Sequence, residues 1–79
     1  MNTIELTPIT DAEIHAIGHD GNSTLAIQFK RHGQPAAIYH YQNFTAERFR
    51  ELQMAESIYG YFMQHIKANT TTYPYTKAE

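Results

Sequence analysis

The stretch that decides the fold is TLAIQFKRHGQPAAIYHYQN, residues 24–43. Apolar residues alternate with other residues over 24–30, a pattern that is typical of a strand with one buried face. Residues 30–35 contain a glycine and a proline, which favour a turn, and residues 36–42 read as a further strand. The stretch therefore predicts an antiparallel β-hairpin.

Two tyrosines in the second strand of this hairpin can serve either the core or a ligand. Because side chains alternate along a strand, Tyr39 and Tyr41 share one face, and Ile38 and His40 share the other. The register that decides between the faces is open at this point. We favour the tyrosines toward the core, because a large aromatic pair adds more to a thin core than one isoleucine beside a histidine. The alternative is a tyrosine platform on which bases stack.

Upstream of the hairpin the sequence predicts one more strand. TDAE at residues 10–13 matches a helix capping box, but Gly18 and the lack of a sustained helical period favour a strand over residues 13–19. Residues 20–22, Asp-Gly-Asn, are a tight-turn signal that joins this strand to the hairpin. We therefore expect a three-stranded antiparallel meander, preceded by an irregular N-terminal arm over residues 1–10.

Helical spacing replaces strand alternation after Phe44. Thr45 reads as an N-cap, and apolar residues recur at helical spacing to about residue 68. Residues 57–60 mark a break between two helices. The expected fold class is α+β, in which the three-stranded antiparallel meander is followed by two consecutive helices packed on one sheet face.

The length of the chain limits its organisation to one small core. A chain of 79 residues supplies enough material for a single domain and no more. We expect that domain to cover residues 11–76, with a flexible C-terminus over residues 77–79.

The composition excludes some chemistries and gives little support to others. The chain has no cysteine, so disulfides, thiolate metal sites and cysteine nucleophiles are excluded. Its five histidines lack a metal-ligand spacing, and no activated nucleophile or phosphate-binding glycine loop occurs. We therefore expect no metal, no cofactor and no enzymatic activity. No apolar run approaches the ~20 residues that span a bilayer and no leader opens the chain, so we expect a cytoplasmic protein without a membrane partner.

Charge and aromatic residues point to different partners. Six Lys and Arg against eight Asp and Glu give a formal charge of −2. A dedicated nucleic-acid binder usually carries a basic excess, so this balance favours a protein partner or self-association through exposed tyrosines. The candidates for partner binding are Tyr59, Tyr61, Tyr73 and Tyr75. The candidates for nucleic-acid binding, by base stacking and phosphate contact, are Lys30, Arg31, Tyr39, Tyr41 and Lys67.

An ordered set of short motifs resembles one known family. The set is IHAIGHD (14–20), LAIQF (25–29), Tyr39-His40-Tyr41, Ala55-x-Ser57, Tyr61-Phe62, His65-Ile66-Lys67 and Tyr73-Pro74-Tyr75. It spans about residues 11–76 and resembles the KTSC family, which is named for its occurrence at the C-terminus of some lysyl-tRNA synthetases and is also seen as small bacterial and phage proteins. The resemblance implies a domain without an established activity, for which RNA binding has been suggested from the synthetase context. The chain departs from the family pattern at His19, where members often have tyrosine.

Together these observations predict a small non-catalytic interaction module. We expect it to engage a protein partner, as a phage or prophage factor acting on a host protein would. The alternative ligand is RNA or another single-stranded nucleic acid, bound by the sheet tyrosines together with Lys30 and Arg31.

Overall fold

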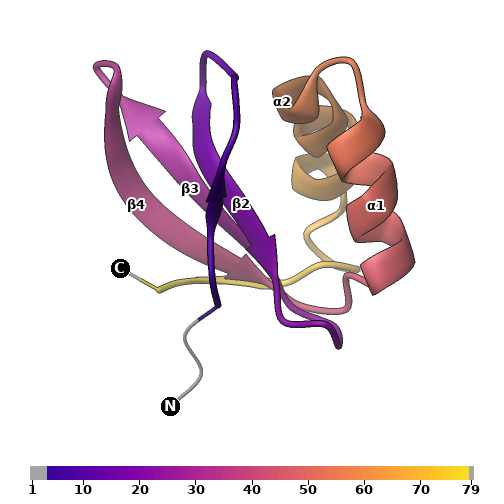
Figure 1. The fold of residues 1–79 in the computed structure, drawn as a ribbon. Coiled ribbons are helices and arrows are strands. Elements are labelled where there is room, and N and C mark those ends of the chain that lie inside the picture. Colours follow the sequence, from indigo (N-terminus) through magenta and orange to yellow (C-terminus); the bar gives the residue numbers. More distant parts are fainter. Residues whose placement is uncertain (1–3, 79) are drawn as a thin grey trace.

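A sheet and a helical layer make up the structure, a computed structural model that describes residues 4–78. The five strands are β1 (Thr7–Pro8), β2 (Ile14–His19), β3 (Leu25–Arg31), β4 (Gln34–Tyr41) and β5 (Tyr75–Lys77). They pair antiparallel in chain order, β1-β2-β3-β4-β5 (Figure 1). Residues 1–3 of the expected N-terminal arm and residue 79 of the expected flexible C-terminus lie outside the described residues.

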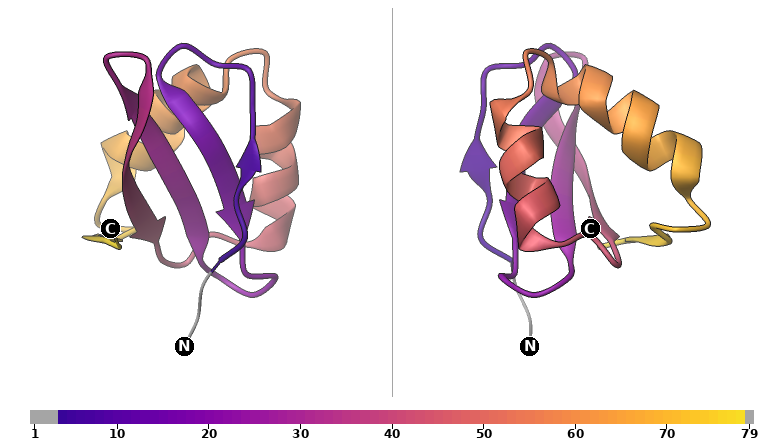
Figure 2. Two further views of the ribbon diagram at one scale, coloured as in Figure 1. Left: turned by 60° about the vertical axis from the view of Figure 1, so that its left-hand side comes forward. Right: turned by 90° about the vertical axis from the view of Figure 1, so that its right-hand side faces the viewer.

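The helical layer lies on one face of the sheet (Figure 2). Its elements are α1 (Ala46–Met54), α2 (Ile58–Tyr61), a π-helical turn η1 (Phe62–Ile66) and a 3-10 turn η2 (Lys67–Asn69). The last three follow one another without a break. Across residues 4–78, the structure contains no helix whose length and apolar character would let it cross a membrane.

The expected three-stranded meander is wrong, because the sheet gains one strand from each end of the described chain. β1 pairs with β2 through Thr7 and Pro8, and β5 pairs with β4 through its three residues. Proline is tolerated at a sheet edge, where its missing N–H removes no ladder bond. Strands of two and three residues carry no readable alternation, so their pairing depends on the neighbouring strand rather than on their own pattern. The second helix also differs from expectation, since only four of its residues are α-helical.

Hydroxyl groups start both helices. The Thr45 side chain accepts a hydrogen bond from the backbone N of Arg48 at 3.2 Å, which confirms the predicted N-cap. Ser57 caps α2 in the same way, with its Oγ 3.0 Å from the backbone N of Gly60. Each cap satisfies one of the backbone donors that a helix leaves unpaired at its first turn. The helices therefore begin where short polar residues stand in the sequence.

Residues with positive φ close the two tight hairpins. In the β2–β3 turn, Gly21 has φ +83°. In the β3–β4 turn, His32 has φ +54° and the next residue, Gly33, has φ +77°. Two successive residues with positive φ are the mark of a type I′ turn, whose twist matches that of the flanking strands. Asp20 supports the first turn by accepting hydrogen bonds from the backbone of Asn22 and Thr24 at 2.8 and 3.1 Å.

The segment before β1 crosses the face of β2 that points away from the helices. A Cβ added to Gly18 would lie 2.1 Å from the backbone oxygen of Glu5, a distance at which the two atoms clash. The residue paired with Gly18 on β3 is Ala26, which is fully buried. Small residues at these two positions therefore create the space in which the N-terminal segment lies against the sheet.

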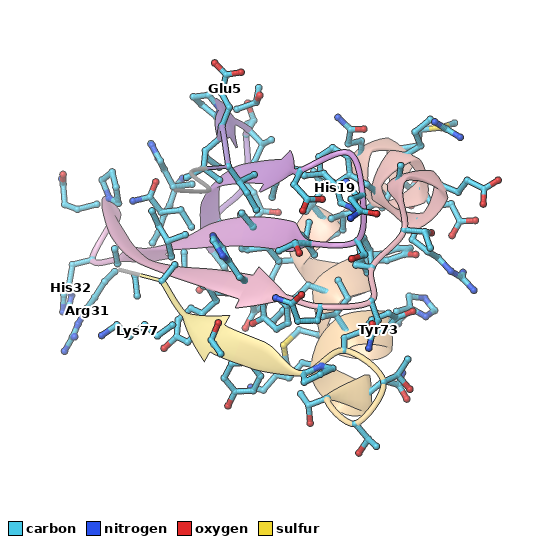
Figure 3. The ribbon with its side chains drawn as sticks, turned by 90° about the horizontal axis from the view of Figure 1, so that it is seen from below. Glu5, His19, Arg31, His32, Tyr73 and Lys77 are labelled. Carbon is cyan, nitrogen blue, oxygen red and sulfur yellow. The ribbon has the colours of Figure 1, made fainter. Side chains whose placement is uncertain are left out.

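His19 connects the end of β2 to the start of the helical layer. Its Nε2 donates to the backbone oxygen of Phe44 at 2.5 Å, and its Nδ1 accepts from the backbone N of Gly21 at 3.0 Å. The imidazole ring also stacks on Phe49 of α1, with ring centroids 5.3 Å apart. Figure 3 shows His19 beside the α1 end of the sheet. This histidine is used for packing and hydrogen bonding within the fold.

The core lies between the sheet and the helices. Its buried members are Ile14, Ile17, Leu25, Ile27, Tyr41, Phe44, Leu52, Phe62 and Ile66. β2 and β3 supply the aliphatic residues of the sheet side, and the helical layer supplies one residue from α1 and two from η1. Tyr41 is 5% exposed. Its place in the core answers the question of orientation that the sequence left open.

Candidate ligand-binding site

A hollow opens between the sheet and the α2–η1 helix, with a volume of about 440 Å³. Its lining residues are Glu13, Phe29, Lys30, Tyr39, Tyr41, Tyr59, Phe62, Lys67, Thr70 and Tyr75. We call this hollow the aromatic pocket. Six of its ten residues are aromatic and none is aliphatic, which suits a flat ligand better than a branched apolar one.

Five rings form a closed circuit in the wall of this pocket. Phe29 contacts Tyr39 and Phe62, with ring centroids 5.8 and 5.3 Å apart. Tyr75 closes the other side, 5.8 Å from Tyr39 and 5.6 Å from Tyr41, and Tyr41 is 5.6 Å from Phe62. Four of these five contacts are edge-to-face, the arrangement that aromatic quadrupoles favour. Each ring of the wall therefore packs against two others.

The register of β3, β4 and β5 brings the tyrosines of the wall together. Tyr41 pairs with Leu25 and Tyr39 pairs with Ile27, so both tyrosines share the face that carries the core. This is the orientation favoured from the sequence. β5 then places Tyr75 directly opposite Tyr41. Tyr75 remains 51% exposed, so one face of the wall is open to a ligand.

Asp11 fastens the helical side of the pocket to the sheet side. Its Oδ1 accepts from the backbone N of Glu13 at 2.8 Å, and its Oδ2 accepts from the backbone N of Tyr59 at 3.3 Å. Its backbone oxygen accepts from the Lys30 ammonium at 2.5 Å. One residue thus fixes three that line the pocket, which limits the freedom of each before a ligand arrives.

A second, shallower hollow adjoins the first and is more basic. It has a volume of about 610 Å³ and is lined by Phe29, Lys30, Arg31, Ala36, Ala37, Tyr39 and Lys77. We call it the basic hollow. Phe29, Lys30 and Tyr39 line both sites. Because of these shared residues, the two hollows form one continuous surface, and Figure 3 shows Arg31 and Lys77 at the same end of the sheet.

The cations of the chain are concentrated on this surface. Four of the six Lys and Arg residues line it, namely Lys30, Arg31, Lys67 and Lys77. Of the seven acidic residues within residues 4–78, Glu13 alone does so. A net charge of −2 therefore conceals a basic surface, because the acidic residues lie elsewhere.

The structure unites most of the residues that the sequence proposed for two different ligands. Lys30, Lys67, Tyr39 and Tyr41, proposed for nucleic acid, line the aromatic pocket together with Tyr59 and Tyr75, proposed for a partner. Arg31 lines the basic hollow.

Two proposed residues lie outside both hollows. The Tyr61 hydroxyl donates to the Glu51 carboxylate at 3.1 Å and so joins α2 to α1. Tyr73 packs edge-on against Phe44, with ring centroids 5.4 Å apart. Both tyrosines are half-buried, and these contacts account for their packing.

Sequence reasoning missed seven residues that line the two hollows and that the fold brings in from separate segments. They are Glu13, Phe29, Ala36, Ala37, Phe62, Thr70 and Lys77. Phe29 and Phe62 were recognised only as apolar residues of a strand and a helix. Lys77 reaches the basic hollow through the pairing of β5 with β4, and no local motif signals that pairing.

Alkaline pH should destabilise the fold through Tyr41. Burial raises the pKa of its phenol above the ordinary value of 10.0, and the nearby Tyr75 and Tyr39 raise that pKa further. A raised pKa in the folded state gives a contribution to stability that is complete below the unfolded pKa and is lost as pH rises. The contribution of Tyr41 should therefore be constant up to about pH 10 and then fall by up to about 1.4 kcal/mol per pH unit.

Urea unfolding at a series of pH values from neutral to alkaline checks this expectation. Tyr41→Phe removes the titrating hydroxyl and should make the alkaline loss of stability smaller. Tyr75→Phe is the control, because the same change at a ring that is 51% exposed should leave most of the loss in place. Equal alkaline losses in the wild type and Tyr41→Phe would contradict the assignment.

Comparisons with known proteins give a family and a fold. The family model described as the KTSC domain matches residues 10–69. A crystal structure of a KTSC domain protein from Yersinia pestis superposes with a TM-score of 0.81 at 24% sequence identity, covering 98% of this chain and 100% of that chain. At this identity the likeness shows a shared fold. No curated protein matches the chain.

Proposed function

Because the chain belongs to the KTSC domain family and carries an aromatic pocket with a basic border, we propose that it is a non-catalytic module that binds single-stranded nucleic acid. The observation that carries the proposal is the clustering of four of the six cations around six aromatic rings. Overall charge favoured a protein partner, but the field that a ligand meets is that of the local surface. The local charge around the pocket therefore outweighs the net charge of the chain as evidence for the type of ligand.

The shape of the pocket favours an unpaired base. Proteins that bind single strands combine a positive groove that follows the backbone with aromatic side chains on which bases stack. Bases within a duplex present edges in the grooves rather than faces, so stacking requires bases that are not paired. A hollow of about 440 Å³ whose lining includes the exposed Tyr75 and the half-buried Tyr59 has the volume to hold a flat heterocycle.

The cations line the two hollows across which the proposed strand would extend. Lys67 borders the helical side of the aromatic pocket, and Arg31 and Lys77 border the basic hollow on the other side of Tyr39. Lys30 lines both sites. A strand with one base in the pocket can thus extend its backbone across cationic groups in both directions.

Fluorescence anisotropy with labelled oligonucleotides tests the proposal. Single-stranded RNA or DNA should bind at low salt, a hairpin duplex of the same composition should bind much more weakly, and the affinity should fall steeply as salt rises. Failure of every single-stranded oligonucleotide to bind at about 50 mM salt would refute the proposed function.

Single cation removals should reveal which phosphate contacts exist. Arg31→Ala and Lys67→Ala should each weaken binding several-fold and reduce the slope of log K against log salt by about 0.7, the value for one phosphate contact on a single strand. Arg50→Ala is the matched control, because Arg50 is exposed on α1 and lines neither hollow. Equal changes of slope in all three variants would mean that only total charge matters.

A protein partner is the second candidate, and β5 is the observation that favours it. This strand has a single neighbour, all three of its residues are exposed, and Tyr75 projects from it half-exposed. An exposed sheet edge can accept a further strand from another chain. Capture of a host protein that survives nuclease treatment and is lost in a proline variant at Lys77, whose backbone N–H lies on the free side of β5, would support this candidate.

A further inference from the structure

Glu13 is the exception to the basic character of the pocket. Its side chain is exposed at the border of the aromatic pocket. Its backbone is fixed on both sides, since its N donates to Asp11 Oδ1 at 2.8 Å and its oxygen accepts from the backbone N of Lys30 at 2.9 Å. Within residues 4–78 its carboxylate forms neither a hydrogen bond nor an ion pair. The main chain thus fixes the position from which this side chain extends at the border of the pocket, and no group within residues 4–78 binds its carboxylate.

A carboxylate in this position works against phosphate binding. Its negative charge repels a phosphate that approaches Lys30 or Lys67, so it reduces the affinity for the backbone of any strand. A carboxylate accepts hydrogen bonds and donates none. Its favourable partners on a nucleic acid are therefore the N–H groups of the bases, as in carboxylate recognition of the cytosine amino group.

The bases differ in what they offer such a group. Adenine, cytosine and guanine carry an exocyclic amino group with two N–H bonds, whereas uracil and thymine offer a single ring N–H that is flanked by two carbonyl oxygens, both of which a carboxylate repels. Lys67 and Thr70, which line the same pocket, supply donors for the ring nitrogen or carbonyl beside that amino group. The polar border therefore matches a base with an amino group next to an acceptor.

We propose that Glu13 makes the aromatic pocket selective for a base with an exocyclic amino group and against uracil and thymine. This inference rests on the proposed function, since it assigns the base that the pocket accepts. Glu13 lowers the affinity for the phosphate backbone, and it increases the difference in affinity between strands that carry different bases. It is a specificity-determining residue of the binding site.

The test uses uridine-tract oligonucleotides that differ only in one central base. The wild type should bind those with a central adenine, cytosine or guanine about tenfold more tightly than the all-uridine strand, as one good polar contact to a base edge allows. Glu13→Gln offers both a donor and an acceptor, so it should remove most of this preference. It should also bind the all-uridine strand more tightly than the wild type does, because one repelling charge is gone.

A matched variant separates base recognition from charge. Glu56→Gln makes the same charge change at an exposed residue that lines neither hollow, and it should keep the preference of the wild type. Equal affinity of the wild type for all four strands, or a preference that survives in Glu13→Gln, would overturn the inference while the proposed function stands. Absence of binding to every strand would refute the proposed function as well. Unchanged thermal midpoints confirm that both variants are folded.

Discussion

Leu52→Ala should lower the free energy of unfolding by about 2–5 kcal/mol, the range for truncating a buried leucine. Leu52 is fully buried and is the only buried residue of α1. α1 has nine residues, and helices shorter than about 12–15 residues are marginal in water without tertiary packing. A domain of this length has a total stability of roughly 4–12 kcal/mol, so the loss of this one contact removes a large share.

Met54→Ala is the control for this change, because Met54 lies on the same helix and is 84% exposed. Substitution there should alter stability by less than about 0.5 kcal/mol. Urea unfolding followed by far-ultraviolet circular dichroism measures both variants. Comparable losses in the two would show that α1 is stabilised by its own helix propensity rather than by docking through Leu52.

Tyr75→Leu should weaken the binding of single-stranded oligonucleotides by about 5- to 150-fold, which corresponds to the ~1–3 kcal/mol of one base–aromatic stack. Tyr75 has the most exposed ring of the pocket wall and contacts Tyr39 and Tyr41 at its inner side. Leucine keeps an apolar group at that position but offers no flat surface to a base. The affinity should fall while the salt dependence stays the same, because no cation has been removed.

Tyr75→Phe separates the ring from its hydroxyl. It keeps the stacking surface and should bind within about twofold of the wild type, since stacking depends on the π-face of the ring. Anisotropy titrations of the three proteins at one salt concentration decide the question. Equal affinity of the leucine and phenylalanine variants would remove Tyr75 from the binding site and return it to the role of an exposed edge residue.

The parts of the fold that the sequence predicted are those with a repeating pattern. The hairpin in residues 24–43 could be predicted because its first strand alternates over seven residues and its turn contains glycine. β1 and β5 could not be predicted, because strands of two and three residues are too short to show a period. Their pairing is decided by the edge that β2 and β4 already provide.

The sequence predicted that aromatic and cationic residues form the site, but it did not predict which of these residues lie together. Tyr39 and Lys30 belong to the same predicted hairpin, Tyr39 on its second strand and Lys30 at the start of its turn, so a common location followed from local order. Glu13, Lys67 and Tyr75 join them from three other segments, namely the bend before β2, the turn η2 and the strand β5, and that meeting depends on packing that has no local signal. The net charge pointed to a protein partner for the same reason, since a sum over the whole chain contains no information about where the cations lie.

The last strand, β5, couples ligand binding at the site to the docking of a strand. Every other strand pairing joins segments that are neighbours in the chain, whereas β5 returns to β4 only after both helices have intervened. The hydrophobic core draws no buried residue from β5, so the core does not depend on the strand that completes the pocket wall with Tyr75. Closing the long loop to β5 has an entropic cost that its few backbone bonds barely offset. Occupancy and docking are thereby linked thermodynamically: a ligand that stacks on Tyr75 favours the docked strand, and a docked strand raises the affinity for that ligand.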